Sequence, residues 1–295
     1  MTRQVQILFH LGAHATDDGL LIRSVLKNRA ALAERGIVVP GPGRYRDILR
    51  EVTTELRGRT ASHDTRDMVL ETIAETDNAD RLILSNENFI CRPDMVLGTD
   101  ALYPKAHKTA WLREVFPGHD TEFALGLRNP AALVPALLAR IDASGRSHRE
   151  RLSDIDLGAL SWLDVVERIV ASNPGCRLLV WCDEDTPFLW SEILREMTDA
   201  HDMTLTGGLD RVQGLLSEDA FERLSTILDR RAAGTEAEHR RLVAAFLDEH
   251  APDDAVEEEI DVPGWDDDVV ARLTEAYEDE LDAIAAVPGV EFLEP

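Results

Sequence analysis

A turn at residues 12–19 is the segment of this chain best suited to bind an anion. It follows an apolar stretch, Val5–Leu11, contains Gly12 and Gly19, and precedes apolar residues that recur at helical spacing from Leu20 to Arg35. A glycine-containing turn between a strand and a helix can present backbone N–H groups to a phosphate. The turn falls short of the Walker A pattern, so its residues alone indicate only a candidate phosphate site.

Glu87 and Arg128 follow two other apolar stretches and are candidates for chemistry with such a ligand. Glu87 comes after the stretch at residues 81–85 and can act as a general base if partial burial raises its pKa. Its alternative role is structural, as the partner of an arginine or a backbone N–H. Arg128 can bind a phosphate through two parallel hydrogen bonds, or it can pair with an acidic residue such as Asp183 or Glu184.

Two histidines near the turn are assigned different roles. His10 and His14 are four residues apart, but they span a strand and a turn rather than a helix, so the spacing does not predict a metal site. His14, at the mouth of the turn, can position an anion if it is protonated near neutral pH. His10 lies inside the apolar stretch and is expected to be a core residue with one hydrogen bond.

Acidic residues gather in the same turn and after a later strand. Asp17 and Asp18 together with residues 183–185 can form a cation site, since carboxylate oxygens suit Mg²⁺ or Ca²⁺. The preferred interpretation is helix capping, with Thr16 as the cap of the first helix, the two aspartates in its first turn, and Asp185 capping a helix near Phe188.

The order of the predicted elements indicates an α/β fold. Strands are expected at residues 5–11, 37–39, 81–85, 122–127 and 176–181, with helices between them. Each predicted strand at the site ends in polar residues. Because ligands bind outside the carboxyl ends of parallel strands, we expect residues 12–19, 85–88, 128–130 and 183–185 to meet there. After Thr204 only helices are expected.

Several of these segments resemble the bacterial sulfotransferase-like family, whose first turn reads Gly-x-x-Lys-Thr-Gly-Thr-Thr. The matching stretch here is His10-Leu-Gly-Ala-His-Ala-Thr-Asp-Asp-Gly, followed by a similar helix and second strand. Leu125-Gly-Leu-Arg-Asn-Pro resembles the family's 3′-phosphate segment, and Val180-Trp-Cys-Asp-Glu-Asp resembles its Tyr-Glu-Asp-Leu strand end. The matches span roughly residues 5 to 200, and their order and spacing carry the resemblance.

The resemblance implies a three-layer α/β/α fold with a central parallel sheet, of the sulfotransferase type of P-loop architecture, followed by C-terminal helices. It implies transfer of a sulfuryl group from phosphoadenylylsulfate to a hydroxyl or amine of a small molecule or glycan. Arg128 would bind the 3′-phosphate, and Glu87 and His14 would be catalytic. The implied residues for the 5′ end of the donor are Gly12, Ala13, His14, Thr16 and Gly19.

The departures from the family pattern suggest a second function. Ala15 replaces the loop lysine, Asp17-Asp18-Gly19 replaces Gly-Thr-Thr, and Ala136 stands where a phosphate-binding serine is expected. A cation from Lys105, Lys108 or Arg23 would compensate for the lost lysine. Without one, the chain is expected to be a non-catalytic binding or interaction module that binds no cofactor.

Composition limits the partners and the compartment. The chain of 295 residues has a net charge of −25, and residues 248–295 alone carry 18 acidic side chains against one basic side chain. Such a chain repels nucleic acid, which is not an expected partner. No apolar stretch approaches the roughly 20 residues that span a bilayer, so no membrane association and a cytoplasmic location are expected. Three cysteines predict no disulfide framework.

Two regions are expected. Residues 1–205 form the sulfotransferase-like α/β domain, and residues 206–295 form an acidic, helical C-terminal layer packed on that domain. A linker is predicted at residues 253–261. The sequence leaves the oligomeric state open.

Overall fold

The first strand and helix form where the apolar pattern predicts them. In the computed structural model, which describes residues 4–74, 76, 78–143, 155–230, 235–252, 260, 262 and 264–295, β1 (Gln6–His10) leads into α1 (Leu20–Leu26). Ile7 and Phe9 of β1 belong to the hydrophobic core on one face of the sheet, and Leu8 belongs to the core on the other face. Because successive strand residues point to opposite faces, β1 must be covered on both.

The strands of the described residues form a single parallel sheet. β2 (Ile37–Val38), β3 (Arg81–Ser85), β1, β4 (Asp120–Leu127), β5 (Arg177–Cys182) and β6 (Val290–Leu293) lie in this order, and every pair is parallel. This arrangement confirms the predicted α/β class with a central parallel sheet.

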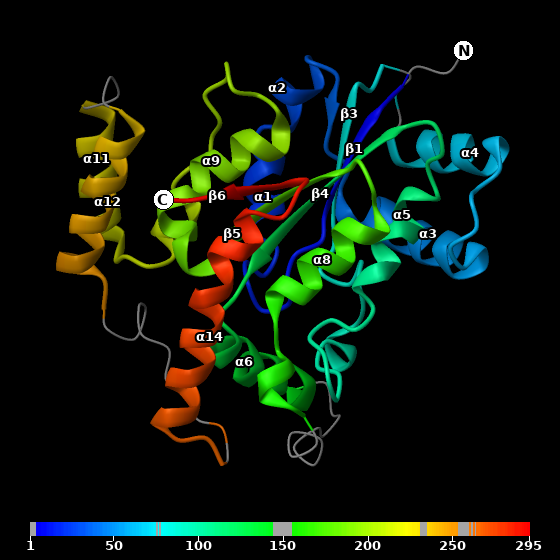
Figure 1. Ribbon diagram of the computed structural model, residues 1–295. Coiled ribbons are helices and arrows are strands. Elements are labelled where there is room, and N and C mark those ends of the chain that lie inside the picture. Colours follow the sequence, from blue (N-terminus) through cyan, green and yellow to red (C-terminus); the bar gives the residue numbers. More distant parts are fainter. Residues whose placement is uncertain are drawn as a thin grey trace.

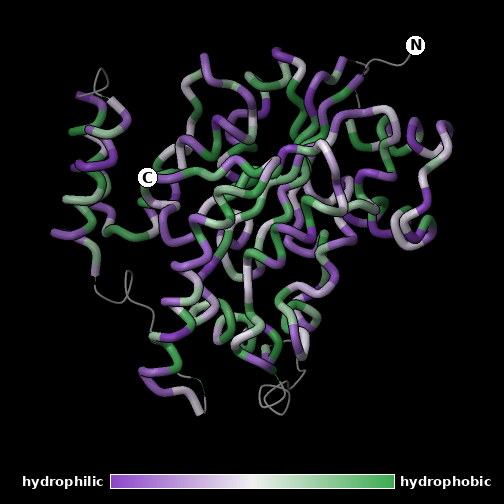
Figure 2. Tube along the Cα trace, in the orientation of Figure 1, coloured by the Kyte–Doolittle hydropathy of each residue, from purple (hydrophilic) through white to green (hydrophobic). Residues whose placement is uncertain are grey.

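Helices cover both faces of the sheet, as a three-layer fold requires (Figure 1). One layer contains α1, α2 (Arg29–Ala33) and α9 (Thr186–Thr198). The other contains α3 (Pro42–Leu56), α4 (His63–Ala74), α5 (Thr109–Arg113), α6 (Pro130–Ala143), α8 (Trp162–Ser172) and α14 (Asp267–Ala285). Hydrophobic residues concentrate along the central strands (Figure 2). No described helix is both long and apolar enough to cross a membrane.

Short helices complete the connections. The described 3-10 helices are η1 (Pro93–Met95), η2 (Ala106–Lys108), η3 (Leu157–Ala159) and η4 (Asp183–Asp185). α10 (Asp210–Gln213), α11 (Glu218–Arg230) and α12 (Glu236–His250) share a small core of their own beside α9. In Figure 1 the pair α11 and α12 stands at the side of the molecule.

The C-terminal region differs from the expectation that only helices follow Thr204. β6 pairs with β5 from Val290 to Leu293 and extends the sheet, so that expectation is wrong. Four residues after a long acidic helix give little strand signal, and their conformation depends on hydrogen bonds to β5. The predicted helices of this region are confirmed as α11, α12 and α14. The predicted linker lies outside the described residues apart from residue 260.

The strand order reverses at β1. β1 lies between β3 and β4, and the helices that follow the two neighbouring strands β1 and β4 lie on opposite faces, since α1 belongs to one core and α6 to the other. Such a reversal opens a crevice at the carboxyl ends of the strands, which is where ligands bind in open α/β sheets.

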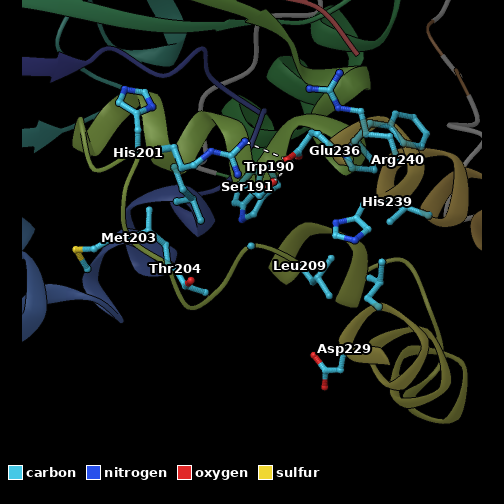
Figure 3. A pocket seen from close by; sticks show the side chains of 18 residues that line it. Trp190, Ser191, His201, Met203, Thr204, Leu209, Asp229, Glu236, His239 and Arg240 are labelled. Atoms are coloured by element: carbon cyan, nitrogen blue, oxygen red, sulfur yellow. Dashed lines mark hydrogen bonds and ion pairs between the residues drawn. The ribbon is translucent and has the colours of Figure 1, made fainter. Parts of the chain in front are cut away.

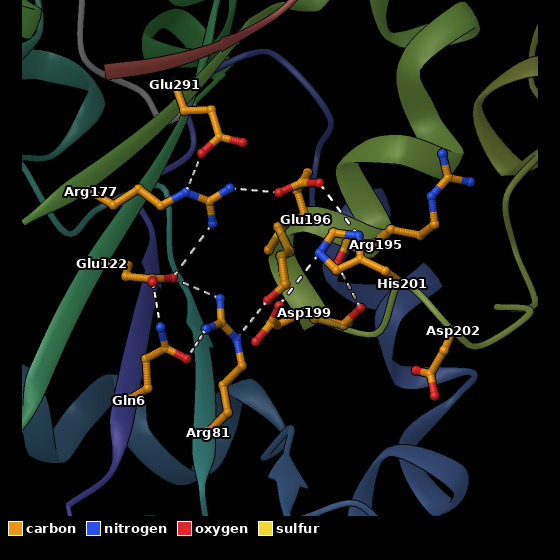
Figure 4. Close-up of polar contacts among 12 residues, drawn as sticks. Gln6, Arg81, Glu122, Arg177, Arg195, Glu196, Asp199, His201, Asp202 and Glu291 are labelled. Carbon is orange, nitrogen blue, oxygen red and sulfur yellow. Dashed lines mark hydrogen bonds and ion pairs between the residues drawn. The ribbon is translucent and has the colours of Figure 1, made fainter. Parts of the chain in front are cut away.

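Buried polar residues connect the strands at the opposite, amino-terminal edge (Figure 4). Arg81 of β3 forms an ion pair with Glu122 of β4 at 2.8 Å, and Gln6 of β1 hydrogen-bonds to both side chains. Arg81 also donates to the carbonyl of Met197 at 3.0 Å. The Arg81 side chain is 4% exposed and that of Glu122 is 13% exposed, so each charge depends on the other. This contact holds three central strands in register.

Replacing Arg81 should therefore destabilise the whole domain. Arg81→Met leaves Glu122 buried without its main partner and is expected to lower the free energy of unfolding by about 3–5 kcal/mol, measured by urea denaturation. The double variant Arg81→Met/Glu122→Leu should recover much of the loss, because neither charge then remains. Arg50→Met removes an exposed arginine paired with Asp47 and serves as the control. A loss for Arg81→Met no larger than for the control would contradict this role.

Candidate functional site

The structure brings the four predicted strand-end segments together at the carboxyl edge of the sheet. The backbone N–H of Asn86 donates to the carbonyl of His10 at 3.1 Å, which joins the segments after β3 and β1. The backbone N–H of Asn129 donates to the Glu184 carboxylate at 2.7 Å, which joins the segments after β4 and β5. Arg128 reaches across to the carbonyl of Ala15 in the turn after β1. These three contacts connect all four segments.

The turn at residues 12–19 curls tightly against the segment after β3. Gly12 has a φ of +58°, and a Cβ placed there would lie 3.3 Å from the Cα of Glu87. A side chain at residue 12 would therefore both strain the backbone and push Glu87 away. Ala15 also adopts a positive φ, at 60°, and its side chain is buried. Asp18 and Gly19 also have positive φ, so four residues of this turn lie in the left-handed region of backbone conformation.

Gly19, not Thr16, is the N-cap of α1, and Asp17 and Asp18 precede the helix, so their predicted place in its first turn is wrong. The carboxylate of Asp17 accepts a hydrogen bond from the N–H of Leu21 at 2.8 Å. The hydroxyl of Thr16 turns back to donate to the Ala13 carbonyl at 2.7 Å, so the predicted cap at Thr16 is wrong. Asp185 occupies the N-cap position of α9 but makes no capping hydrogen bond with its side chain, so that expectation is wrong as well.

His14 is buried and held in a fixed orientation. Its Nδ1 lies 2.9 Å from the Tyr103 hydroxyl, which also accepts from the His14 backbone N–H, and its Nε2 lies 3.4 Å from the Asn88 side-chain oxygen. Burial lowers the pKa of His14 to about 4, so the ring is neutral at pH 7. His14 therefore carries no positive charge with which to bind an anion at pH 7. His14 instead orients Tyr103 and Asn88 beside the turn.

Arg140 of α6 connects the turn with Glu87, a contact that the sequence analysis missed. Its guanidinium pairs with the Glu87 carboxylate at 2.9 Å and also with Asp18. Glu87 has a raised pKa because it is partly buried and because Asp17 lies near. Glu87 thus has the arginine partner expected of a structural role. It also has the raised pKa expected of a general base. The signal in the sequence was a single basic residue in α6, whose other residues are apolar apart from Asp142.

The three cations named as substitutes for the missing lysine lie in different places. Arg23 donates to the carbonyl of Asp18 at 3.0 Å and so reaches the turn. Lys108 lies over the ring of Trp111, 4.4 Å from its centroid. Lys105 contacts the sulfur of Met95 at 3.3 Å. Of these three residues, Arg23 is the one that these contacts place at the turn.

The Arg128 side chain contacts the turn at residues 12–19 and is not paired with the Glu184 carboxylate. Its guanidinium donates to the Ala15 carbonyl, and its own carbonyl accepts from the indole N–H of Trp162 at 2.7 Å. Glu184 instead accepts from the Tyr277 hydroxyl at 3.2 Å as well as from the backbone of Asn129. Arg128 is therefore oriented toward the segment where the anion is expected.

Asp183 is a buried carboxyl group at the end of β5. Burial raises its pKa from the ordinary 3.8 to about 7, although the positive charge of Arg211 opposes the shift. The contact with Arg211 is long, at 3.6 Å, which leaves the charge poorly compensated. Asp183 is therefore the carboxyl group of this edge that changes charge near neutral pH.

His10 is confirmed as a core residue. It is 3% exposed, its Nδ1 lies 2.9 Å from the Ser85 hydroxyl, and its ring stacks on Trp181. Among the described residues, no group of three or more histidine, cysteine or carboxylate side chains is arranged to hold a metal ion.

A separate cavity of about 590 Å³ lies between α9 and the α11–α12 pair, away from the carboxyl edge (Figure 3). Glu236 of α12 accepts hydrogen bonds there from Ser191 at 3.1 Å and from Arg195 at 3.2 Å. These charged groups compensate each other and attach α12 to α9.

Fold and site together define a three-layer α/β protein with a charged site at the carboxyl edge of its parallel sheet. The sequence matches no family model, and no curated protein matches it. Among solved structures, the chain is similar to the crystal structure of a sulfotransferase from Alicyclobacillus acidocaldarius, with 12% identity and a TM-score of 0.44. The match covers 83% of this chain and 99% of that chain.

The raised pKa of Asp183 predicts a specific dependence of stability on pH. The folded protein binds a proton at Asp183 up to about pH 7, whereas an unfolded aspartate loses it near pH 4, so this group lowers stability as the pH rises between the two values. Asp183→Asn removes the penalty and should be more stable than the unchanged protein at pH 8, by at most about 4 kcal/mol, but not at pH 4. Urea denaturation at both pH values measures this.

Asp47→Asn, at an exposed carboxylate of α3 paired with Arg50, is the matched control and should leave the pH dependence unchanged. An equal effect of Asp183→Asn at pH 4 and pH 8 would show that Asp183 does not titrate in this interval.

Proposed function

We propose that the carboxyl-edge site binds phosphoadenylylsulfate and transfers its sulfuryl group to a hydroxyl or amine of a small-molecule or glycan acceptor. The proposal rests on the resemblance of the strand-end segments to bacterial sulfotransferases and on one structural observation. Arg140 places a guanidinium against both the turn after β1 and Glu87, so a cation and a candidate base lie in one site despite Ala15.

The transferring group gains negative charge that the site must stabilise. Arg140 and Arg128 both reach the turn from α6 and its start, and Arg23 contributes a third guanidinium from α1. Arg140 can approach the donor from the side opposite to α1, because α1 and α6 cover opposite faces of the sheet. This arrangement would replace the lysine of the family pattern with arginines from neighbouring elements.

The existing partner of Arg140 does not prevent this role. The Asp18 side chain is 71% exposed, and an exposed ion pair contributes roughly 1 kcal/mol or less. A phosphate carries more charge than Asp18 and accepts two parallel hydrogen bonds from an arginine. Exchange of Asp18 for a phosphate therefore costs little, since the released carboxylate returns to water.

The reaction would proceed by direct displacement. Glu87 accepts the proton from the acceptor hydroxyl or amine, and the acceptor atom forms a bond to sulfur. The bond between sulfur and the bridging phosphate oxygen breaks, and 3′-phosphoadenosine-5′-phosphate leaves with the electron pair. The raised pKa of Glu87 makes it a stronger base than an ordinary glutamate, and Arg140 keeps it oriented.

The second candidate function is a non-enzymatic binding module with the same fold. The observation that favours it is that the site's arginines already have protein partners: Arg128 bonds to the Ala15 carbonyl, and Arg140 bonds to Glu87 and Asp18. Ala136 adds no phosphate ligand from α6. In this case the site holds itself closed and binds no donor.

Calorimetric titration with 3′-phosphoadenosine-5′-phosphate separates the two functions. We expect micromolar binding, at least about tenfold weaker in Arg140→Met because a charge-assisted contact is lost, and tighter in Asp18→Asn because a competing carboxylate is removed. Arg50→Met, which removes an exposed guanidinium of α3 that pairs with Asp47, is the control. No heat and no thermal stabilisation at millimolar ligand would leave the binding-module function.

Loss of the base should affect transfer without affecting donor binding. Glu87→Gln is expected to lower the rate by about 10²–10⁴-fold, measured as nucleotide release with a panel of phenols and amines, while calorimetric affinity stays close to that of the unchanged protein. The rate should rise with pH until Glu87 is ionised, at a higher pH than for an ordinary glutamate. Transfer by Glu87→Gln at an unchanged rate would exclude Glu87 as the base.

A further inference from the structure

A second cavity borders the segment that follows Glu87. It has a volume of about 580 Å³, within the range of pockets that hold small molecules, and it lies between η1 and α6. The turn that carries Gly98 closes one side, where the Gly98 N–H donates to the Ala101 carbonyl at 2.9 Å. The residues that line the cavity are Arg92, Pro93, Asp94, Met95, Leu97, Gly98, Thr99, Pro104, Lys105, Leu138, Ile141 and Ile155.

Apolar residues make up seven of the twelve that line the cavity, and glycine, polar and charged residues make up the rest. Leu138 and Ile141 come from α6, one turn apart, and face Met95 and Leu97 from the η1 side. A ligand that covers these apolar residues gains from the removal of apolar surface from water. The body of the ligand is therefore expected to be apolar.

Lys105 is one of two cationic residues in this lining. Its ammonium group donates to the Met95 sulfur at 3.3 Å, and thioether sulfur is a weak acceptor. The other two lysines have stronger partners: Lys27 pairs with Asp210 at 2.7 Å, and Lys108 lies over the Trp111 ring. Within the described part of the chain, no carboxylate is paired with Lys105. Its charge therefore lacks a strong partner at the wall of an apolar cavity.

The remaining charges of the lining compensate each other. Arg92 and Asp94 form two contacts, at 3.1 and 3.0 Å, so the Asp94 carboxylate opposes an anion less than its formal charge suggests. Lys105 distinguishes this cavity from the one beside α12, where Glu236 compensates the guanidinium of Arg195.

We propose that this cavity binds a small apolar molecule bearing a carboxylate, with the carboxylate on the Lys105 ammonium group. The inference deepens the proposed function, on which it rests for the role of this molecule as the acceptor. The cavity lies between η1 and α6, and the ion pair between Glu87 and Arg140 joins α6 to the turn that leads to η1. An acceptor held here lies beside α6, which carries Arg140, and beside η1, in the segment that follows Glu87.

Titration with 2-naphthoate in the absence of nucleotide tests this binding. The neutral analogue 2-naphthalenemethanol and the cationic analogue 2-naphthylmethylamine have the same ring system and isolate the effect of charge. We expect 2-naphthoate to bind at least about tenfold more tightly than either analogue, which is the gain from one charge-assisted contact.

Variants of the two neighbouring lysines assign this preference to a residue. Lys105→Met should abolish the preference for the carboxylate, Lys105→Arg should retain it, and Lys108→Met, three residues away on another contact, should leave it unchanged. Leu138→Trp should fill the cavity and weaken all three probes. Because the ammonium group is not a core contact, the Lys105 variants should fold even if Leu138→Trp does not.

Equal binding of the three probes, tighter binding of the amine, or a carboxylate preference that survives in Lys105→Met would overturn the inference. So would the absence of 2-naphthoate binding at millimolar concentration. Since nucleotide is absent from these titrations, their outcome is independent of whether 3′-phosphoadenosine-5′-phosphate binds at the turn after β1.

Discussion

The polar ladder of Arg81, Gln6 and Glu122 holds the three central strands in register, and the site at the opposite edge depends on that register. A shift by one residue would exchange the two faces of a strand, and the apolar residues of β1 would face the wrong layers. Such a shift would also move the turn after β1 along its neighbours. The contact of this turn with Glu87 depends on β1 and β3 ending in register, with His10 opposite Ser85. Its contact with Arg128 depends on β4 running on to Leu127, beyond Ala124, which faces the end of β1.

The carboxyl edge collects charges of both signs from four strands. Its acidic residues repel a polyanionic donor. Arg140 of α6 and Arg128, just before α6, reach the same space and compensate part of that negative charge. Whether a phosphate binds depends on an exchange of hydrogen-bond partners. It must replace Asp18 as the partner of Arg140 and the Ala15 carbonyl as the partner of Arg128. The exposure of Asp18 lowers the cost of that exchange, and the burial of Asp183 leaves a second carboxyl group neutral below about pH 7.

Sequence reasoning located the strands and their polar ends because these depend on local patterns. Five stretches of apolar residues correspond to β1 to β5, and the segments expected to meet at one edge do so. It did not find β6, whose four residues are a strand because β5 supplies hydrogen-bond partners. It also assigned the first helix cap to Thr16, although the N-cap is Gly19 and Asp17, one position after Thr16, accepts the hydrogen bond from the Leu21 N–H. The competition between neighbouring side chains is decided by the backbone angles of the turn.

The sequence by itself determined the α/β class and the place of the candidate site, because strand and helix periodicity and strand-end polarity are properties of consecutive residues. Only the tertiary structure decided which charges meet. Arg140 reaches Glu87 and Asp18 because α6 passes over two other strand ends, and His14 is neutral because the turn encloses it. Contacts between residues far apart in the chain, and the burial that shifts a pKa, depend on how the layers pack and not on local sequence.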